Sequence, residues 1–227
     1  MEAARRSGAT PSPSGTTFRL WAPAATSAEV VINNVRFDMA RSANGWFTAT
    51  VATARAGTRY RFQIDGEIDV PDPASRYQPE DVTGPSEIIY HDAFHWRADH
   101  WRGRPWHEAI FLECHVGTFS PAGTFRGMAE RLDHIADTGI TAIELMPIAD
   151  FPGRYNWGYD GVLWYAPDHT YGSPDDLKHL IDEAHRRGIM VFLDVVYNHF
   201  GPEGNHLASY APQFFSSAAT PWGAAID

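Results

Sequence analysis

The sequence predicts a chain of two unlike parts: an all-β, immunoglobulin-like sandwich, followed by strand–helix units of a parallel sheet. Two observations indicate this. Between residues 16 and 92, short segments alternate polar and apolar residues and are separated by turn signals, which is typical of a small sandwich. After residue 108, apolar segments alternate with stretches of helical period, which is typical of right-handed βαβ units. Residues 93–107 then form a connector.

Composition excludes several classes of protein. The chain has 227 residues, of which 44% are hydrophobic and 20% charged, as expected for a globular protein with a real core. A formal net charge of -10 opposes binding to nucleic acid or to anionic membranes. There is a single cysteine and no apolar run of about 20 residues, so we expect a cytoplasmic protein without an internal disulfide.

The first part of the chain begins with residues 1–15, which are rich in Ala, Ser, Pro and Gly and are expected to be a flexible tail. Four strands are predicted after it, at residues 17–21, 29–32, 46–51 and 60–64. The pair Asp65-Gly66 supplies a turn after the last of them.

Tryptophans of this half have two interpretations. Trp21 and Trp46, in the predicted strands, could stack on sugar rings, but in strands such residues more often belong to the core. The connector at residues 93–107 also holds three tryptophans, which implies that it packs against other parts of the chain.

In the second half, residues 108–227, three buried strands are predicted at 109–116, 141–146 and 191–196. One helix lies between the first two strands, with Met128, Leu132 and Ile135 on one face and Gly139 at its end. A second helix has Ser173 as its N-cap, Pro174 in its first turn and Gly188 after its last turn.

Polar and aromatic groups collect where these strands end. His115, the long loop 148–170 and residues 194–199 all belong to the carboxyl edge of the sheet, where active groups of parallel sheets gather. Asp194 lies inside an apolar run, where a carboxylate is costly unless it has a partner or a task. The alternative is that Asp194 only caps neighbouring backbone and that His199 is an ordinary loop histidine.

The loop at residues 155–161 contains three aromatic rings, an acid and two glycines. Rings that stack on C–H faces, with a few polar groups for hydroxyls, suit a pyranose sugar. The alternative is a packed aromatic loop without a ligand.

Together these segments resemble the α-amylase family of glycoside hydrolases. Residues 194–199 are similar to its third-strand signature, residues 139–147 to its second-strand signature, and residues 20–23 to the start of the small β-domain of several members. Residues 113–119 and 157–162 are most similar to the trehalose-releasing members. The resemblance covers residues 16–227. Branching enzymes are similar too, but usually carry another residue at the position of Asp160.

The resemblance implies a (β/α)₈ TIM barrel, of which this chain holds the first three βα units, and a retaining hydrolysis of the α-1,4 bond next to the terminal trehalose of maltooligosyltrehalose. Retention requires two carboxyls about 5 Å apart. In the family these follow the fourth and fifth strands, so we expect them beyond residue 227. No catalytic residue is assigned, and the 227 residues alone are expected to be inactive.

The same resemblance implies a substrate site. Tyr159 is expected to stack on the sugar at the cleavage point, His199 to bind its hydroxyls, and Asp194 and Asn198 to organise the hydrogen bonds around it. The predicted substrate-binding residues are Trp157, Tyr159, Asp160, Asp194, Asn198 and His199. No cluster of acids surrounds Asn198, which ligates calcium in some relatives, so neither a metal nor a cofactor is predicted.

Two alternative functions remain open at this point. One is a fragment of a glycogen branching or debranching enzyme, and the other is a stand-alone α-glucan-binding module in which only the β-domain acts. In each case the expected partner is an α-glucan or maltooligosyltrehalose, with no nucleic acid and no membrane. Because three strands cannot close a barrel, self-association through open strand edges is also expected.

Overall fold

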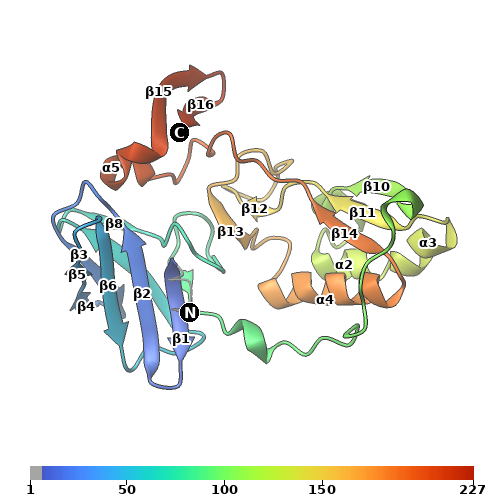
Figure 1. Cartoon of the computed structure of the whole chain (residues 1–227), viewed down its shortest axis with the longest axis horizontal. Helices are drawn as coiled ribbons and strands as arrows, with labels where there is room; N and C mark the ends of the chain where they lie inside the picture. Colours follow the sequence, from blue (N-terminus) through green and yellow to red (C-terminus); the bar gives the residue numbers. More distant parts are fainter. Residues whose placement is uncertain (1–6) are drawn as a thin grey trace.

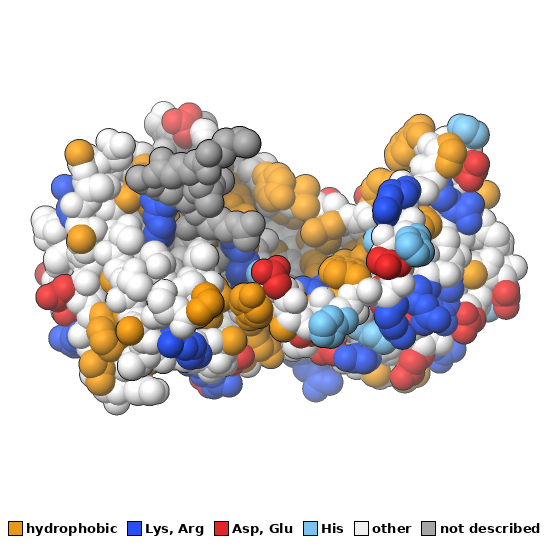
Figure 2. Space-filling model, turned by 60° about the horizontal axis from the view of Figure 1, so that its bottom comes forward, with side chains coloured by type: hydrophobic (Ala, Val, Ile, Leu, Met, Phe, Trp, Pro, Cys, Tyr) orange, Lys and Arg blue, Asp and Glu red, His pale blue; other side chains and the backbone are white. Residues whose placement is uncertain are grey.

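A computed structural model describes residues 7–227, apart from the side chains of residues 218 and 219. The chain forms two parts that lie side by side, a β-sandwich and a smaller parallel sheet flanked by helices (Figure 1). Figure 2 shows a hollow between them, with hydrophobic side chains exposed in it. Within the described residues, no helix has the length and apolarity that crossing a membrane requires.

The sandwich is built from two antiparallel sheets. One has the order β1-β2-β6-β5 and the other the order β4-β3-β7-β8, with β9 also paired to β7. All four predicted strands are confirmed, as β2, β3, β6 and β7. The strands are β1 (Gly8–Ser12), β2 (Gly15–Trp21), β3 (Ala28–Ile32), β4 (Val35–Asp38), β5 (Ala40–Arg41), β6 (Trp46–Val51), β7 (Arg59–Ile64), β8 (Ile68–Val70) and β9 (Ser86–Glu87).

The expected flexible tail is wrong for part of its length. Residues Gly8–Ser12 form β1, which pairs antiparallel with β2 in the register Gly8↔Arg19 to Ser12↔Gly15. Pairing with a neighbouring strand overrides the low strand propensity of this Gly- and Pro-containing segment. Residues 1–6 of the predicted tail lie outside the described residues.

The second half contains three parallel strands in the order β10-β11-β14, which confirms the predicted βαβ arrangement. They are β10 (Phe111–Cys114), β11 (Ala142–Leu145) and β14 (Met190–Leu193). The helices of this half are α1 (Val116–Phe119), α2 (Phe125–Ala129), α3 (Leu132–Asp137) and α4 (Pro174–Arg186). Helix α4 begins as predicted, with a capping box between Ser173 and Asp176.

Three expectations for this half require correction. All three strands are shorter than predicted. The central strand β11 is buried as expected, but β10 and β14 are less buried because they are the edges of the sheet: Phe111 is 39% exposed and Leu193 48%. The single helix predicted around residues 128–135 is split into α2 and α3 by a turn at residues 130–131. The long loop 148–170 contains a hairpin of β12 (Ala149–Asp150) and β13 (Leu163–Pro167).

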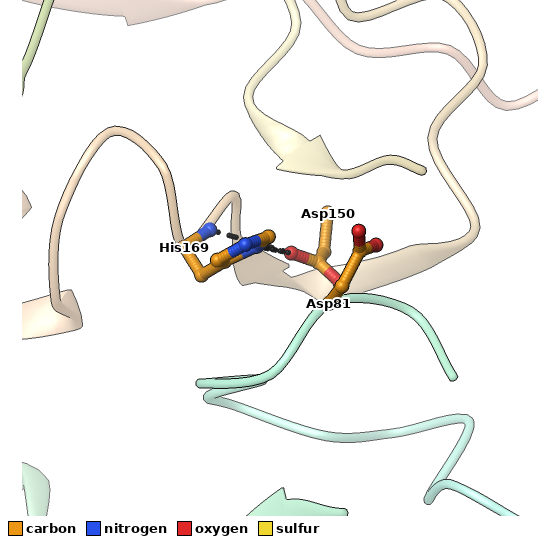
Figure 3. A group of neighbouring side chains, drawn as sticks. All are labelled: Asp81, Asp150 and His169. Carbon is orange, nitrogen blue, oxygen red and sulfur yellow. Dashed lines mark hydrogen bonds and ion pairs between the residues drawn. The ribbon is translucent and has the colours of Figure 1, made fainter. Parts of the chain in front are cut away.

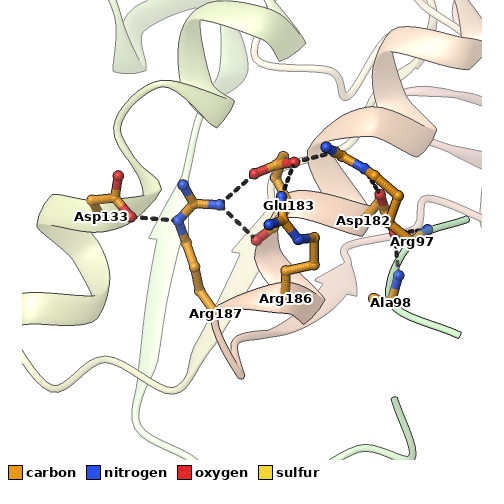
Figure 4. Close-up of polar contacts among 7 residues, drawn as sticks. All are labelled: Arg97, Ala98, Asp133, Asp182, Glu183, Arg186 and Arg187. Atoms are coloured by element: carbon orange, nitrogen blue, oxygen red, sulfur yellow. Dashed lines mark hydrogen bonds and ion pairs between the residues drawn. The ribbon is translucent and has the colours of Figure 1, made fainter. Parts of the chain in front are cut away.

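The connector at residues 93–107 is held against helix α4 (Figure 4). The buried carboxylate of Asp182 accepts hydrogen bonds from the backbone amides of Arg97 and Ala98, each at 2.9 Å, and pairs with the Arg97 guanidinium at 2.9 Å. Trp101 stacks on His185, with ring centroids 4.9 Å apart. The expected packing therefore holds for Trp101. Trp106, the first residue of η2 (Trp106–Glu108), is 72% exposed but still contacts the rings of Phe111 and Phe192, with centroids 5.6 and 6.1 Å away. A 3-10 turn of the same length, η1 (His91–Ala93), lies at the start of the connector.

The C-terminal segment returns to the sandwich. It contains α5 (Leu207–Tyr210), η3 (Pro212–Phe214) and the hairpin of β15 (Phe215–Thr220) and β16 (Gly223–Ile226), seen above the sandwich in Figure 1. Phe200, Leu207 and Tyr210 belong to the same buried cluster as the sandwich strands. The Ala24 amide donates to the Tyr210 carbonyl at 3.1 Å. The C-terminal segment therefore shares the core of the sandwich, whereas the parallel sheet and its helices form a separate buried cluster.

Asp72 is a fully buried acid inside the sandwich half. Its carboxylate accepts hydrogen bonds from the Tyr60 hydroxyl at 2.5 Å and the Ala74 amide at 2.8 Å, and its own amide donates to Ser86 at 3.0 Å. Burial raises the pKa of the Asp72 carboxyl to about 6, although these hydrogen bonds oppose the shift.

The raised pKa of Asp72 predicts a pH-dependent cost in stability. The folded state binds this proton more tightly than the unfolded state, where the pKa is about 3.9, so the free energy of unfolding falls as the pH rises from about 4 to about 6. Relative to Asp72→Asn, the wild type should lose about 3 kcal/mol across that window. Urea unfolding at several pH values measures it. Asp137→Asn, at an exposed acid, is the control and should track the wild type; a difference between wild type and Asp72→Asn that is constant with pH would contradict the prediction.

Candidate functional site

A cavity of 720 Å³ lies at the carboxyl edge of the parallel sheet. All six residues predicted to bind substrate line it, although they come from two segments far apart in the sequence. Its lining consists of Asn156, Trp157, Tyr159, Asp160, Asp194, Val195, Val196, Asn198, His199 and Trp222. The structure thus brings the predicted residues together around one space.

Asp194 is placed by the strand that precedes it. It directly follows β14, and its amide donates to the Leu145 carbonyl of β11 at 2.9 Å, which continues the parallel pairing by one residue. The Tyr159 hydroxyl donates to the Asp194 carboxylate at 3.3 Å. Burial and the nearby Asp194 carboxylate raise the pKa of Tyr159, so its hydroxyl stays protonated as a donor.

His199 is largely buried, since only 8% of its surface is exposed. Its Nε2 donates to the Tyr159 carbonyl at 3.0 Å, because a carbonyl can only accept. Its Nδ1 is buried and has no hydrogen-bond partner among the described residues. His199 therefore fixes the backbone of Tyr159 and keeps one ring nitrogen as an unused acceptor.

Asn156 organises the aromatic loop from within. Its side chain donates to Asp160 at 2.6 Å and accepts from the Gly158 amide at 2.8 Å. The backbone carbonyl of Asn156 accepts a hydrogen bond from His115 Nε2 at 2.8 Å, and the Tyr171 hydroxyl lies 3.1 Å from the same nitrogen. The loop is consequently tied to the end of β10 through His115.

Gly158 is the point where this loop passes closest to its neighbour. Its φ of +96° is unfavourable for side chains other than hydrogen, and a Cβ at this position would lie 1.8 Å from the carbonyl oxygen of Pro147. Only glycine fits here. The close approach sets the position of the two residues that follow, Tyr159 and Asp160.

The arrangement combines exposed rings with polar groups of fixed position. Trp157 is 73% exposed, Trp222 67% and Tyr159 41%, and each lines the cavity. Because Asp160 and Asp194 line the same cavity, the rings can stack on sugar faces while the carboxylates accept hydrogen bonds from hydroxyls.

Sequence reasoning missed four residues of the lining: Asn156, Val195, Val196 and Trp222. Asn156 carries a signal that could have found it, because an amide next to a glycine in an aromatic loop often orders the backbone. Trp222 carries none, since it comes from the β15–β16 hairpin and reaches the cavity only through tertiary structure.

A second polar group lies away from this cavity, near the β12–β13 hairpin. One potential ligand atom each from Asp81, Asp150 and His169 lies within 4.8 Å of the others (Figure 3). The sequence prediction did not include these residues.

The two parts of the chain match two known domain families, the catalytic domain of an enzyme and a carbohydrate-binding module. Residues 81–214 match the alpha amylase catalytic domain, and residues 6–79 match carbohydrate-binding module 48, the isoamylase N-terminal domain. The chain belongs to the alpha-amylase family.

Within the family, the chain is similar to the N-terminal portion of malto-oligosyltrehalose trehalohydrolases. It is 46% identical to that of Saccharolobus solfataricus over 92% of this chain, and 44% identical to that of Deinococcus radiodurans over 98%. The chain spans only 37% of the length of each of these relatives. A 1,4-alpha-glucan branching enzyme of Streptomyces avermitilis is 35% identical over 92% of the chain.

Two solved structures have a similar fold over nearly the whole of this chain. A candidate alpha amylase of Salmonella typhimurium superposes with a TM-score of 0.95 at 45% identity, over 98% of this chain and 38% of that one. A pullulanase of Paenibacillus barengoltzii, solved with maltotriose, superposes with a TM-score of 0.86 at 27% identity, over 99% of this chain and 44% of that one.

Two glycine variants test the importance of the close approach at Gly158. Gly158→Ala places a methyl group against the Pro147 carbonyl, whereas Gly153→Ala, also at positive φ, meets nothing within 4 Å. Both introduce backbone strain, but Gly158→Ala should lower the free energy of unfolding by about 2 kcal/mol more, because the loop must move. Urea unfolding and amide exchange of residues 155–161 measure this. Equal losses in the two variants would show that the contact does not constrain the loop.

Proposed function

We propose that this chain forms the substrate-binding portion of a retaining glycosidase that hydrolyses the α-1,4 bond next to the terminal trehalose of maltooligosyltrehalose. The observation that carries the proposal is the convergence of Trp157, Tyr159, Asp160, Asp194, Asn198 and His199 on one cavity. The identity of the chain to trehalohydrolases supports the choice of substrate.

In this proposal Tyr159 stacks on the sugar at the cleavage point, and its hydroxyl is held by Asp194. His199 acts through its free Nδ1, which can accept a hydrogen bond from a sugar hydroxyl after a small opening of the site. Hydrogen bonds of this kind strengthen as an oxocarbenium-like transition state forms. Asn198 and Asp160 contact neighbouring hydroxyls, and Trp157 offers a further ring.

The reaction also needs a nucleophile and an acid/base, and the proposal assigns neither to the 227 residues. They would follow the fourth and fifth strands of the complete TIM barrel, in line with the greater length of the relatives. The 227-residue chain is therefore proposed to bind saccharide without cleaving it. We also propose that it self-associates, because the edge strands β10 and β14 leave Phe111 and Leu193 exposed.

A glycogen branching activity is the second candidate, and the identity to a branching enzyme supports it. The presence of Asp160, whose carboxylate is fixed by Asn156, favours the trehalose-releasing reaction. The carbohydrate-binding module in residues 6–79 fits either enzyme, since both act on α-glucans.

Saccharide binding should depend on the ring of Tyr159. Tyr159→Ala is expected to weaken the binding of maltooligosaccharides to this chain by about 1–3 kcal/mol, as lost aromatic contact, and Tyr159→Phe by much less. Isothermal titration calorimetry measures both variants. Tyr155→Ala is the matched control, since Tyr155 belongs to the same loop, is 87% exposed and does not line the cavity. Equal losses in Tyr159→Ala and Tyr159→Phe would mean that the hydroxyl, not stacking, is responsible.

Substrate profiling of the native gene product that contains this chain separates the two reactions. We expect free trehalose from maltooligosyltrehalose, detected by chromatography, and no new α-1,6 branches on amylose. Branch formation without trehalose release would assign the chain to a branching enzyme. The purified 227-residue chain should release no trehalose above a buffer blank, and trehalose release by it would show that the catalytic carboxyls lie within these residues.

A further inference from the structure

We propose that Asp81, Asp150 and His169 form a binding site for a divalent transition-metal cation of the zinc type, which fastens the sandwich half to the parallel-sheet half. The three residues are distant in sequence, and each approaches from a different segment. Asp81 lies in the loop between β8 and β9, Asp150 is the last residue of β12, and His169 follows β13 (Figure 3).

Asp150 provides the main evidence for a bound ligand, because one of its buried carboxylate oxygens has no partner among the described residues. Its side chain is fully buried, and only one of its oxygens is used: Oδ1 lies 3.3 Å from both the amide and the Nδ1 of His169. Oδ2 is buried and has no hydrogen-bond partner among the described residues. An unpaired buried carboxylate oxygen costs several kcal/mol, so a native fold rarely leaves one without a proton or a cation.

The neighbouring Asp168 shows how this fold treats a buried aspartate that needs no cation. It is equally buried, and its carboxylate accepts from the amides of Phe151 at 3.2 Å and Thr170 at 2.9 Å, and from the Thr170 hydroxyl. Backbone donors satisfy both of its oxygens. Asp150 lies on β12, the other strand of the same hairpin, and its Oδ2 lacks an equivalent donor among the described residues.

Asp81 supplies the second carboxylate, which accepts one hydrogen bond from its own loop and one from the opposite half of the molecule. Its Oδ1 accepts from the Val82 amide at 2.6 Å, and its Oδ2 accepts from the Gly153 amide at 2.9 Å. Each oxygen keeps a lone pair for a metal. The bond to Gly153 already joins the β8–β9 loop to the β12–β13 hairpin, and a cation would strengthen that junction.

The donor set selects the kind of cation. One imidazole and two carboxylates suit zinc and similar metals, whereas calcium takes six to eight oxygens and magnesium prefers water and carboxylate. Zinc bonds of about 2.1 Å in a tetrahedral site place ligand atoms about 3.4 Å apart. The ligand atoms now lie up to 4.8 Å apart. A small movement of Asp81 and His169, whose side chains are only partly buried, would shorten these separations to about 3.4 Å.

Calorimetric titration of the tag-free 227-residue chain with ZnCl₂, CaCl₂ and MgCl₂ tests the proposal. We expect one zinc site per chain, and an affinity lowered at least about tenfold in Asp81→Asn, Asp150→Asn and His169→Gln. The controls are Asp137→Asn and His134→Gln, which change the same residue types at exposed positions on α3 and should bind zinc as the wild type does. Far-UV circular dichroism checks the fold of each variant; if Asp150→Asn does not fold, the partly exposed Asp81 and His169 decide the result.

Thermal unfolding provides the second readout. Zinc should raise the melting temperature of the wild type and slow proteolysis of residues 71–85, but not in the three site variants. Zinc binding that is unchanged in Asp81→Asn and His169→Gln would place the ion on surface histidines and overturn the site. Tighter binding of calcium or magnesium would overturn the transition-metal assignment, and the absence of any metal effect would mean that Asp150 and His169 form only an ion pair.

Discussion

The parallel pairing of β11 with β10 and β14 is the constraint on which the candidate site depends. The register pairs Cys114 with Leu145 and Leu145 with Leu193, so all three strands end at the same level. Residues that follow the strands must then share one edge, which brings His115 and Asp194 to the same side as the aromatic loop. A shift of the register would separate these side chains even though every helix and strand remained.

Buried aspartates hold the junctions between segments in this fold. Asp182 fixes the connector to α4, and Asp72 links β7 to the segment that leaves the sandwich. Asp168, at the end of the β12–β13 hairpin, accepts hydrogen bonds from the backbone amides of Phe151 and Thr170 and so joins the two ends of the hairpin. Since burying a carboxylate is costly, each is stabilised only when enough donors converge on it, and this makes such junctions specific. Asp150 is the member of this group whose second oxygen has no donor among the described residues.

Local sequence was sufficient for several elements that depend on neighbouring residues, although not for the turn that separates α2 from α3. The sandwich strands follow from a period of two, and the start of α4 follows from Ser173, Pro174 and Asp176, whose hydrogen bonds lie within one turn. The six predicted site residues could be found because strand ends of parallel sheets share an edge, and because residues 194–199 resemble a family signature. These features need no knowledge of distant contacts.

The tertiary structure alone decided what distant contacts control. Strand β1 exists because β2 offers it a partner, and β14 is partly exposed because it lies at the edge of its sheet. Trp222 reaches the cavity, and Asp81 reaches Asp150 and His169, across separations that leave no pattern in the sequence. The physical reason is that hydrogen-bond pairing, burial and ligand geometry depend on which surfaces meet in space, whereas periodicity and capping depend only on residues within a turn or a strand.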